Sequence, residues 1–146
     1  MRAEIAEIER GFMLIGRYKE LGATAAGPEE RRLERSGYIL LRRLEDEGPM
    51  SIGQLAHAFS LDTSTVNRQT TVLLRGGLAE RIPDPDGGMA RKLRITEEGL
   101  RRVEEERACR LNGLDKVLSN WTSAELIAFA EGLARFNASI ERVVQD

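Results

Sequence analysis

Residues 62–76 carry side chains that could contact the edges of base pairs. At about 100° per residue on a helix, Val66, Thr70 and Leu73 share one face. The opposite face holds hydroxyl groups and arginines, and no acid follows Asp62. Arginine can pair with guanine through two hydrogen bonds, and hydroxyl groups reach base edges or phosphates. An ordinary solvated helix face, which more often mixes glutamate with lysine, is the alternative. We predict contacts with double-stranded DNA at Thr63, Ser64, Thr65, Asn67, Arg68, Thr71 and Arg75.

Residues arranged for catalysis or metal binding are not recognisable in the sequence. It has no nucleophile elbow, glycine-rich phosphate loop or Ser-His-Asp arrangement, so we predict that the protein is not an enzyme. The only histidine, His57, has no spaced histidine or carboxylate cluster beside it, so we expect no metal and no cofactor. The single cysteine, Cys109, excludes an internal disulfide and leaves a redox-responsive regulator as an alternative.

Charge is distributed unevenly along the 146 residues. The net charge is −2, but residues 51–96 hold six basic and four acidic side chains between two acidic segments. A local basic surface can suffice for binding DNA, because counterion release depends on charges close to the phosphates. No apolar run reaches the roughly 20 residues of a membrane-spanning helix. The start, MRAEIAEIERG, lacks the apolar core of a signal peptide, so we expect a cytoplasmic protein without a membrane partner.

Two short helices and a hairpin are predicted in the middle of the chain. Ser51 and Gln54 form a capping box at the start of the first helix, and Asp62 is a good N-cap for the second. Strands over 78–82 and 91–95 follow; in the second, apolar residues alternate with basic ones that would form a solvated face. This order is the layout of a winged helix-turn-helix. The predicted fold class is therefore mainly α with a small β-hairpin wing, flanked by long dimerisation helices.

Long helices are predicted on both sides of this motif, over 4–20, over 28–47 and beyond Thr96. In the helix after Thr96, the acidic run 104–106 is most simply a solvated face paired with nearby arginines. The first and last helices carry more apolar positions than a small winged core could bury, which favours a homodimer. Packing of the last helix on the first within one chain is the alternative. The predicted interface residues are Ile5, Ile8, Phe12, Leu126, Phe129, Leu133, Phe136, Ile140 and Val143.

The run from Gly48 to Gly99 resembles the core of MarR-type transcription regulators. It contains glycine-proline, S-x-x-x-L-A, D-x-S-T-V-x-R, R-G-G-L, D-P and I-T-E-x-G in that order. The resemblance implies a winged DNA-binding domain (31–99) and a helical dimerisation region (1–30 and 100–146). It also implies a dimeric repressor on a pseudo-palindromic operator. Carried over to this chain, it makes Ser64, Thr65 and Arg68 base and phosphate contacts, and it places Ser51 near a phosphate.

The predicted wing departs from the family's pattern. MarR-type regulators usually carry D-R or D-R-R after the D-P turn, and one of those arginines enters the minor groove. Here the corresponding positions are Gly87, Gly88 and Met89. Either Arg91 and Lys92 replace the missing arginines as DNA contacts, or this wing reads DNA weakly. A winged protein–protein interaction module without DNA readout is a further alternative.

A small effector is also implied by the resemblance. Family members commonly respond to aromatic or phenolic ligands bound between the dimerisation helices and the winged domain, which then leave the operator. Phe12, Tyr18 and Tyr38 fall on the helices that would line such a pocket. Packing in the core explains these three side chains at least as well, so both interpretations stay open.

Overall fold

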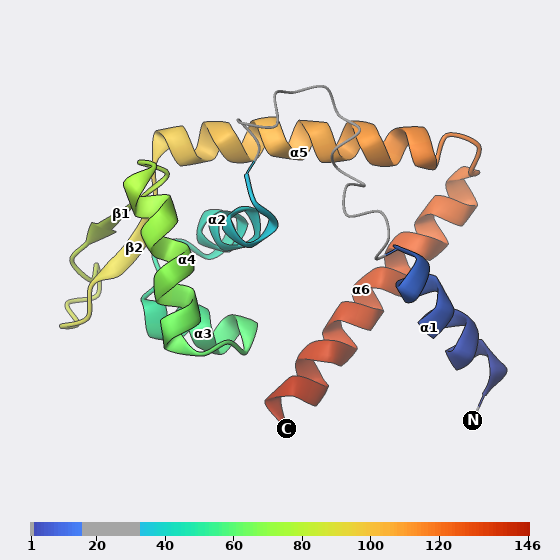
Figure 1. Ribbon diagram of the computed structural model, residues 1–146, viewed down its shortest axis with the longest axis horizontal. Coiled ribbons are helices and arrows are strands. Elements are labelled where there is room, and N and C mark those ends of the chain that lie inside the picture. Colours follow the sequence, from blue (N-terminus) through green and yellow to red (C-terminus); the bar gives the residue numbers. More distant parts are fainter. Residues whose placement is uncertain (1, 16–32) are drawn as a thin grey trace.

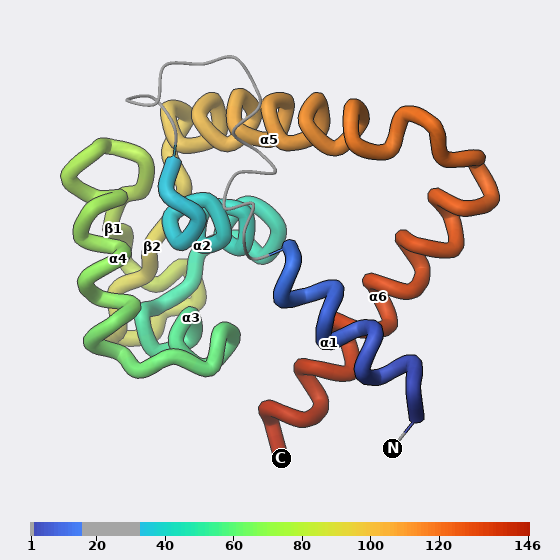
Figure 2. The backbone as a smooth tube through the Cα atoms, turned by 45° about the vertical axis from the view of Figure 1, so that its right-hand side comes forward, coloured from blue at the N-terminus to red at the C-terminus, as the bar shows by residue number. Residues whose placement is uncertain are grey.

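The computed structural model describes residues 2–15 and 33–146, and within them it has the predicted winged helix-turn-helix fold (Figure 1). Helices α2 to α4, strands β1 and β2 and the first half of α5 form one group of elements, which we call the winged unit. Helix α5 leads away from this unit, and α6 turns back and crosses α1 (Figures 1 and 2). The elements are α1 (Ala3–Ile15), α2 (Arg35–Glu47), α3 (Ile52–Phe59), α4 (Thr63–Arg75), β1 (Ala79–Ile82), β2 (Lys92–Ile95), α5 (Glu97–Val117) and α6 (Ser123–Gln145).

The starts of the short helices follow from local hydrogen bonds, as predicted. The Gln54 amide donates to the Ser51 hydroxyl over 3.1 Å, and the Ser51 amide donates to the Gln54 side chain over 2.9 Å. The sequence predicted a helix over 28–47, but α2 begins only at Arg35. Leu33 and Glu34 precede the helix, and Glu34 has an extended backbone. Leu33 contacts the core from outside the helix, so its apolar character reflects burial and not helical periodicity. Pro28 lies outside the described residues.

The core of the winged unit lies between α2 and the elements around it. Leu40, Leu41 and Leu44 of α2 are at most 2% exposed, and they meet Leu55 of α3 and Val103 of α5. The buried face of α4 consists of Val66, Thr70 and Leu73, as the helical spacing predicted. Burying these side chains removes them from water and fixes which face of α4 points outward.

Strands β1 and β2 are antiparallel, with Ala79 opposite Ile95. Met50 extends this pairing through two backbone hydrogen bonds to Leu93, of 3.1 and 2.8 Å. The wing is therefore attached to the segment that connects α2 to α3 as well as to α4 and α5.

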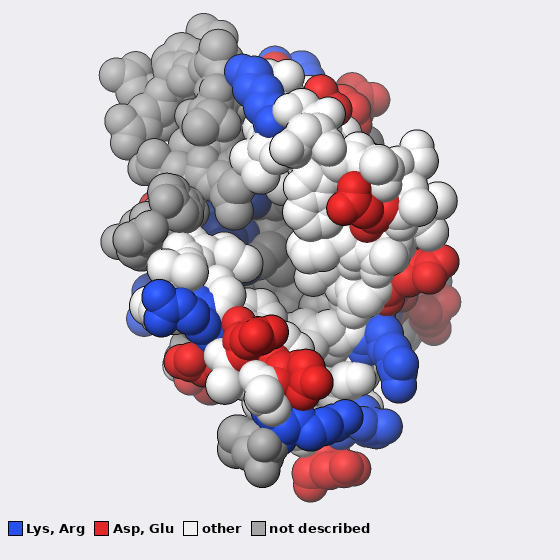
Figure 3. Space-filling model, turned by 90° about the vertical axis from the view of Figure 1, so that its right-hand side faces the viewer, with Lys and Arg blue, Asp and Glu red and all other residues white. Residues whose placement is uncertain are grey.

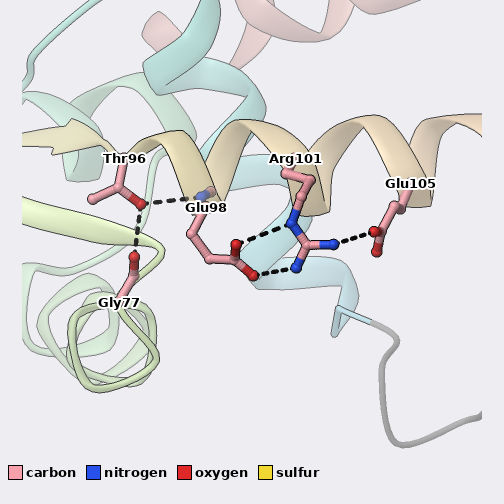
Figure 4. Close-up of polar contacts among 6 residues, drawn as sticks. Gly77, Thr96, Glu98, Arg101 and Glu105 are labelled. Carbon is pink, nitrogen blue, oxygen red and sulfur yellow. Dashed lines mark hydrogen bonds and ion pairs between the residues drawn. The ribbon is translucent and has the colours of Figure 1, made fainter.

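Thr96 joins the end of α4 to the start of α5 (Figure 4). Its hydroxyl donates to the Gly77 carbonyl over 2.6 Å and accepts from the Gly99 amide over 3.0 Å. Gly77 has a φ of 72°, the left-handed conformation that glycine adopts readily after a helix. One turn further along α5, Arg101 bridges Glu98 and Glu105, as Figure 4 also shows.

The first half of α5 belongs to the packing of the winged unit. Arg107 pairs with Glu45 of α2 over 2.8 Å. The prediction of a solvated acidic run is wrong at Glu106, which is 4% exposed and accepts from Arg110. This residue lies on the side of α5 that faces α2, one turn beyond buried Val103. The proposed domain boundary near residue 100 consequently falls inside a continuous helix.

Helices α1 and α6 contain no buried residue, although both are amphipathic. The Phe12 and Phe136 rings stack with centroids 5.2 Å apart, yet each residue stays at least 40% exposed. Uncharged side chains cover much of the side on which these helices lie (Figure 3). None of the helices in the described ranges is long and apolar enough to cross a membrane.

Replacing Gly99 by alanine should lower the free energy of unfolding by about 1–3 kcal/mol through overpacking. A Cβ at this position would lie 2.1 Å from the Leu78 carbonyl oxygen and 2.7 Å from the Ile95 side chain. Gly132→Ala in α6 is the matched control, because nothing lies within 4 Å of its added Cβ. That variant should be more stable by about 0.5–1 kcal/mol. Urea unfolding at one protein concentration measures both, and equal effects would contradict the close contact at Gly99.

Candidate nucleic-acid interface

Helix α4 lies at the edge of the winged unit (Figure 1), and its polar face is exposed to solvent. Ser64, Asn67, Arg68 and Arg75 are exposed on this face. In the described part of the chain, neither Arg68 nor Arg75 forms an ion pair. The structure therefore gathers the predicted residues of this helix on one accessible surface; Thr63 is also exposed, and Thr65 and Thr71 are partly exposed.

Asp62 organises the first turn of α4. Its Oδ1 atom accepts from the Ser64 hydroxyl over 2.7 Å and from the Thr65 amide over 2.7 Å. The bond from Ser64 is the largest cause that lowers the pKa of Asp62 to about 2, followed by the bonds from Thr65, with a small contribution from Arg68. The carboxylate is therefore ionised at neutral pH, and it can accept hydrogen bonds but not donate them.

The basic residues of β2 are paired with acids, so the face predicted to be basic and solvated is neutralised, although Leu93 is buried as the alternation predicts. Lys92 lies 3.5 Å from Asp84, and both side chains are only 13% exposed. Arg94 forms an ion pair with Glu80, which is its partner in the strand register. The backbone amide of Asp86 and the nearby Lys92 ammonium both lower the pKa of Asp84, against the opposing effect of desolvation. Each basic residue of β2 thus has an acidic residue beside it.

Two arginines of the wing have no ion-pair partner among the described residues, Arg81 and Arg91. They line a groove between the wing and the start of α3, together with Ser51 and Gly53. Cationic side chains beside a helix N-terminus suit a phosphate group. Ser51 and Arg91 were predicted from the sequence and Arg81 was missed, because its place in this groove depends on the strand register. At the tip of the wing, Met89 is fully exposed.

The three candidate ligand residues do not come together in the described structure. Tyr38 is 6% exposed, accepts a 3.3 Å hydrogen bond from Arg42, and has the Arg110 guanidinium 4.2 Å from its ring centroid. It lines a cleft with Arg42 and four further residues, and Phe12 is not among them. Tyr18 lies outside the described residues. Among the residues that the structure describes, no group of three or more side chains could hold a metal ion.

Comparison with known proteins agrees with this geometry. Residues 33–87 match the model of the MarR family. YxaD, an uncharacterised HTH-type transcriptional regulator of Bacillus subtilis (strain 168), is 37% identical over 105 residues, which cover 72% of this chain and 73% of that protein.

Two solved structures share the fold along almost the whole chain. A MarR family protein from Bacillus stearothermophilus has a TM-score of 0.75 at 24% identity and covers 96% of this chain and 98% of its own. The PcaV transcriptional regulator from Streptomyces coelicolor, solved with its natural ligand, has a TM-score of 0.67 at 24% identity. The match covers 90% of this chain and 91% of the PcaV chain. Together with the relation to YxaD, the winged fold and the polar face of α4, these matches establish that the chain belongs to the MarR family of DNA-binding transcriptional regulators.

Proposed function

We propose that the protein is a homodimeric repressor that binds a pseudo-palindromic operator and leaves it when a small aromatic ligand binds. The observation that carries the proposal is the outward face of α4, where Arg68 and Arg75 form no ion pair in the described structure. A helix of this kind fits the major groove, which is about 12 Å wide. In a two-fold dimer, the two recognition helices would enter half-sites about 34–36 Å apart.

The apolar surface of α1 and α6 supports the dimer. Leu133, Phe136 and Ile140 are each at least 40% exposed on one side of α6, and Ile8 and Phe12 are similarly exposed on α1. Contact between α1 and α6 within one chain leaves all of these side chains open to water. A second copy would bury them and gain about 25 cal/mol for each square ångström of apolar surface. The remaining predicted interface residues, Ile5, Leu126, Phe129 and Val143, are exposed as well.

Release by a ligand would use the cleft beside Tyr38. Arg42 and Arg43 line it, and the Arg43 Nε atom is buried without a hydrogen-bond partner in the described structure. Two guanidinium groups beside the rings of Tyr38 and Phe59 suit a small aromatic acid, and they outnumber the one carboxylate of the lining, Asp46. Arg43 also lies 3.9 Å from Glu47. The cleft lies against α2, which contacts both α4 and α5, so a bound acid could favour a spacing of the two recognition helices that does not fit the operator.

Arg68→Ala should weaken binding to a duplex selected by the protein by about 1–3 kcal/mol. Arg94→Ala is the matched control on the wing, and it should have a smaller effect because Glu80 already neutralises this charge and Arg94 does not line the groove. Fluorescence anisotropy between 50 and 200 mM salt, roughly the range over which phosphate contacts weaken strongly, measures both. Unchanged affinity for Arg68→Ala, or binding by the parent protein that is independent of salt, would favour a protein–protein interaction module instead.

Phe136→Asp should convert the dimer to a monomer, since it places a charge in the proposed apolar interface. Ala138→Asp adds the same charge two positions later, on the opposite side of α6 from Phe136, and should leave the dimer intact. Sedimentation velocity gives the mass of each variant, and circular dichroism verifies that both are folded. A parent protein that sediments as a monomer at micromolar concentration would refute the dimer.

Benzoate or 4-hydroxybenzoate should release the protein from its selected duplex if the cleft binds an aromatic acid. Arg42→Ala should raise the concentration needed for release, because it removes a cation from the cleft. Arg35→Ala, at the start of α2 and outside the cleft, is the control. Anisotropy titrations with each acid measure the effect, and equal responses of the two variants would place the ligand elsewhere.

A further inference from the structure

The hydroxyl group of Ser64 has a fixed hydrogen-bonding role before any DNA is bound. Ser64 is the second residue of α4, exposed, and its Oγ atom lies 2.7 Å from Asp62 Oδ1. The first residues of a recognition helix are those that reach base edges in helix-turn-helix proteins. The orientation of this one hydroxyl therefore bears on which bases the helix can accept.

The position of the hydroxyl hydrogen follows from the chemistry of the two partners. A serine hydroxyl can donate one hydrogen bond and accept two, whereas an ionised carboxylate can only accept. Since the pKa of Asp62 is lowered to about 2, its carboxylate has no proton to donate at neutral pH. Ser64 must be the donor, and only its oxygen lone pairs remain for a base.

Thr71 repeats this arrangement nearly two turns further along the same face. Its Oγ1 atom lies 2.7 Å from the backbone carbonyl of Asn67, which can only accept. The polar face of α4 therefore combines hydroxyl groups that accept with arginines that can only donate. Arg68, one turn after Ser64, lies between the two hydroxyl positions in sequence.

We infer that Ser64 acts as a hydrogen-bond acceptor for the exocyclic amino group of an adenine or cytosine, close to a guanine that Arg68 contacts. This inference rests on the operator binding proposed above. In the major groove, adenine N6 and cytosine N4 are donors, whereas thymine O4 and guanine O6 and N7 are acceptors. A Ser64 oxygen that can only accept is attracted by the amino group of adenine or cytosine and repelled by the acceptors of thymine and guanine. The Arg68 guanidinium selects guanine.

The separation of the two contacts follows from helix geometry. Ser64 and Arg68 are four residues apart, or about 6 Å along the axis of α4. Base pairs are stacked about 3.4 Å apart. The base with the amino group and the guanine should thus lie within about one or two base pairs of each other in each half-site.

Selection from a library of random duplexes, long enough for two half-sites, tests this inference with four proteins. They are the parent chain, Ser64→Ala, Asp62→Asn and Asp62→Gly. Asp62→Asn removes the negative charge but keeps a side-chain oxygen that accepts from Ser64 and from the Thr65 amide. Asp62→Gly removes that acceptor, and glycine is itself a tolerated N-cap, so α4 should persist. Circular dichroism verifies the helix content of every variant.

The parent protein should enrich adenine or cytosine at one position beside a conserved guanine, and Asp62→Asn should enrich the same bases. Ser64→Ala should lose this preference but keep the guanine. In Asp62→Gly, the Ser64 hydroxyl is free to donate as well as accept, so thymine and guanine should also appear at that position. Removing the amino group from the selected base, as purine in place of adenine or 2-pyrimidinone in place of cytosine, should weaken binding by the parent about three- to tenfold. The same removal should not affect Ser64→Ala.

Two results would overturn the inference, and they can be told apart. A motif that is identical for the parent and Ser64→Ala, or one with thymine or guanine at the position that depends on Ser64, refutes the role of Ser64 while leaving operator binding intact. The absence of any enriched motif for the parent protein refutes operator binding itself, and the inference with it.

Discussion

The contact of Thr96 and Gly99 with the end of α4 is the constraint on which the other parts of the fold depend. The Thr96 hydroxyl bridges the Gly77 carbonyl and the Gly99 amide, and Gly99 lies against the Leu78 backbone where no side chain fits. Three segments therefore meet at one point: the recognition helix, the wing and the long helix α5. Because α5 continues to α6, the orientation of α4 relative to the proposed dimer surface is set here. A shift of α5 would move α4 with it.

The distribution of ion pairs explains how a chain with a net charge of −2 can bind DNA. On the wing, Asp84 and Glu80 neutralise Lys92 and Arg94. On α5, Arg101 and Arg107 are likewise held by glutamates. The arginines of α4, and Arg81 and Arg91 of the wing, lack ion-pair partners in the described structure, so the positive field is concentrated on the two elements proposed to contact DNA.

The parts of the structure that the sequence predicts are those determined by neighbouring residues. Caps at Ser51 and Asp62 and the buried stripe of α4 depend on spacings of three or four residues, and each was predicted correctly. The ion pair between Lys92 and Asp84 depends on how the hairpin folds, which the alternation of residue types does not specify. The burial of Glu106 depends on the packing of α5 against α2, so the sequence pattern of a charged run gave the wrong answer there.

Asp62 links the stability of α4 to its proposed specificity. An N-cap needs an acceptor for the free amides of the first turn, and serine, threonine, asparagine and aspartate all provide one. A carboxylate differs from serine and threonine because it cannot donate in return, so it orients a neighbouring hydroxyl in only one way. Asp62 consequently determines that the Ser64 hydroxyl can only accept a hydrogen bond from DNA, although Asp62 need not contact DNA itself. Folding already orients the Ser64 hydroxyl, so the entropy of fixing it is not lost again when the operator binds. Bases that present only acceptors at this position are therefore disfavoured.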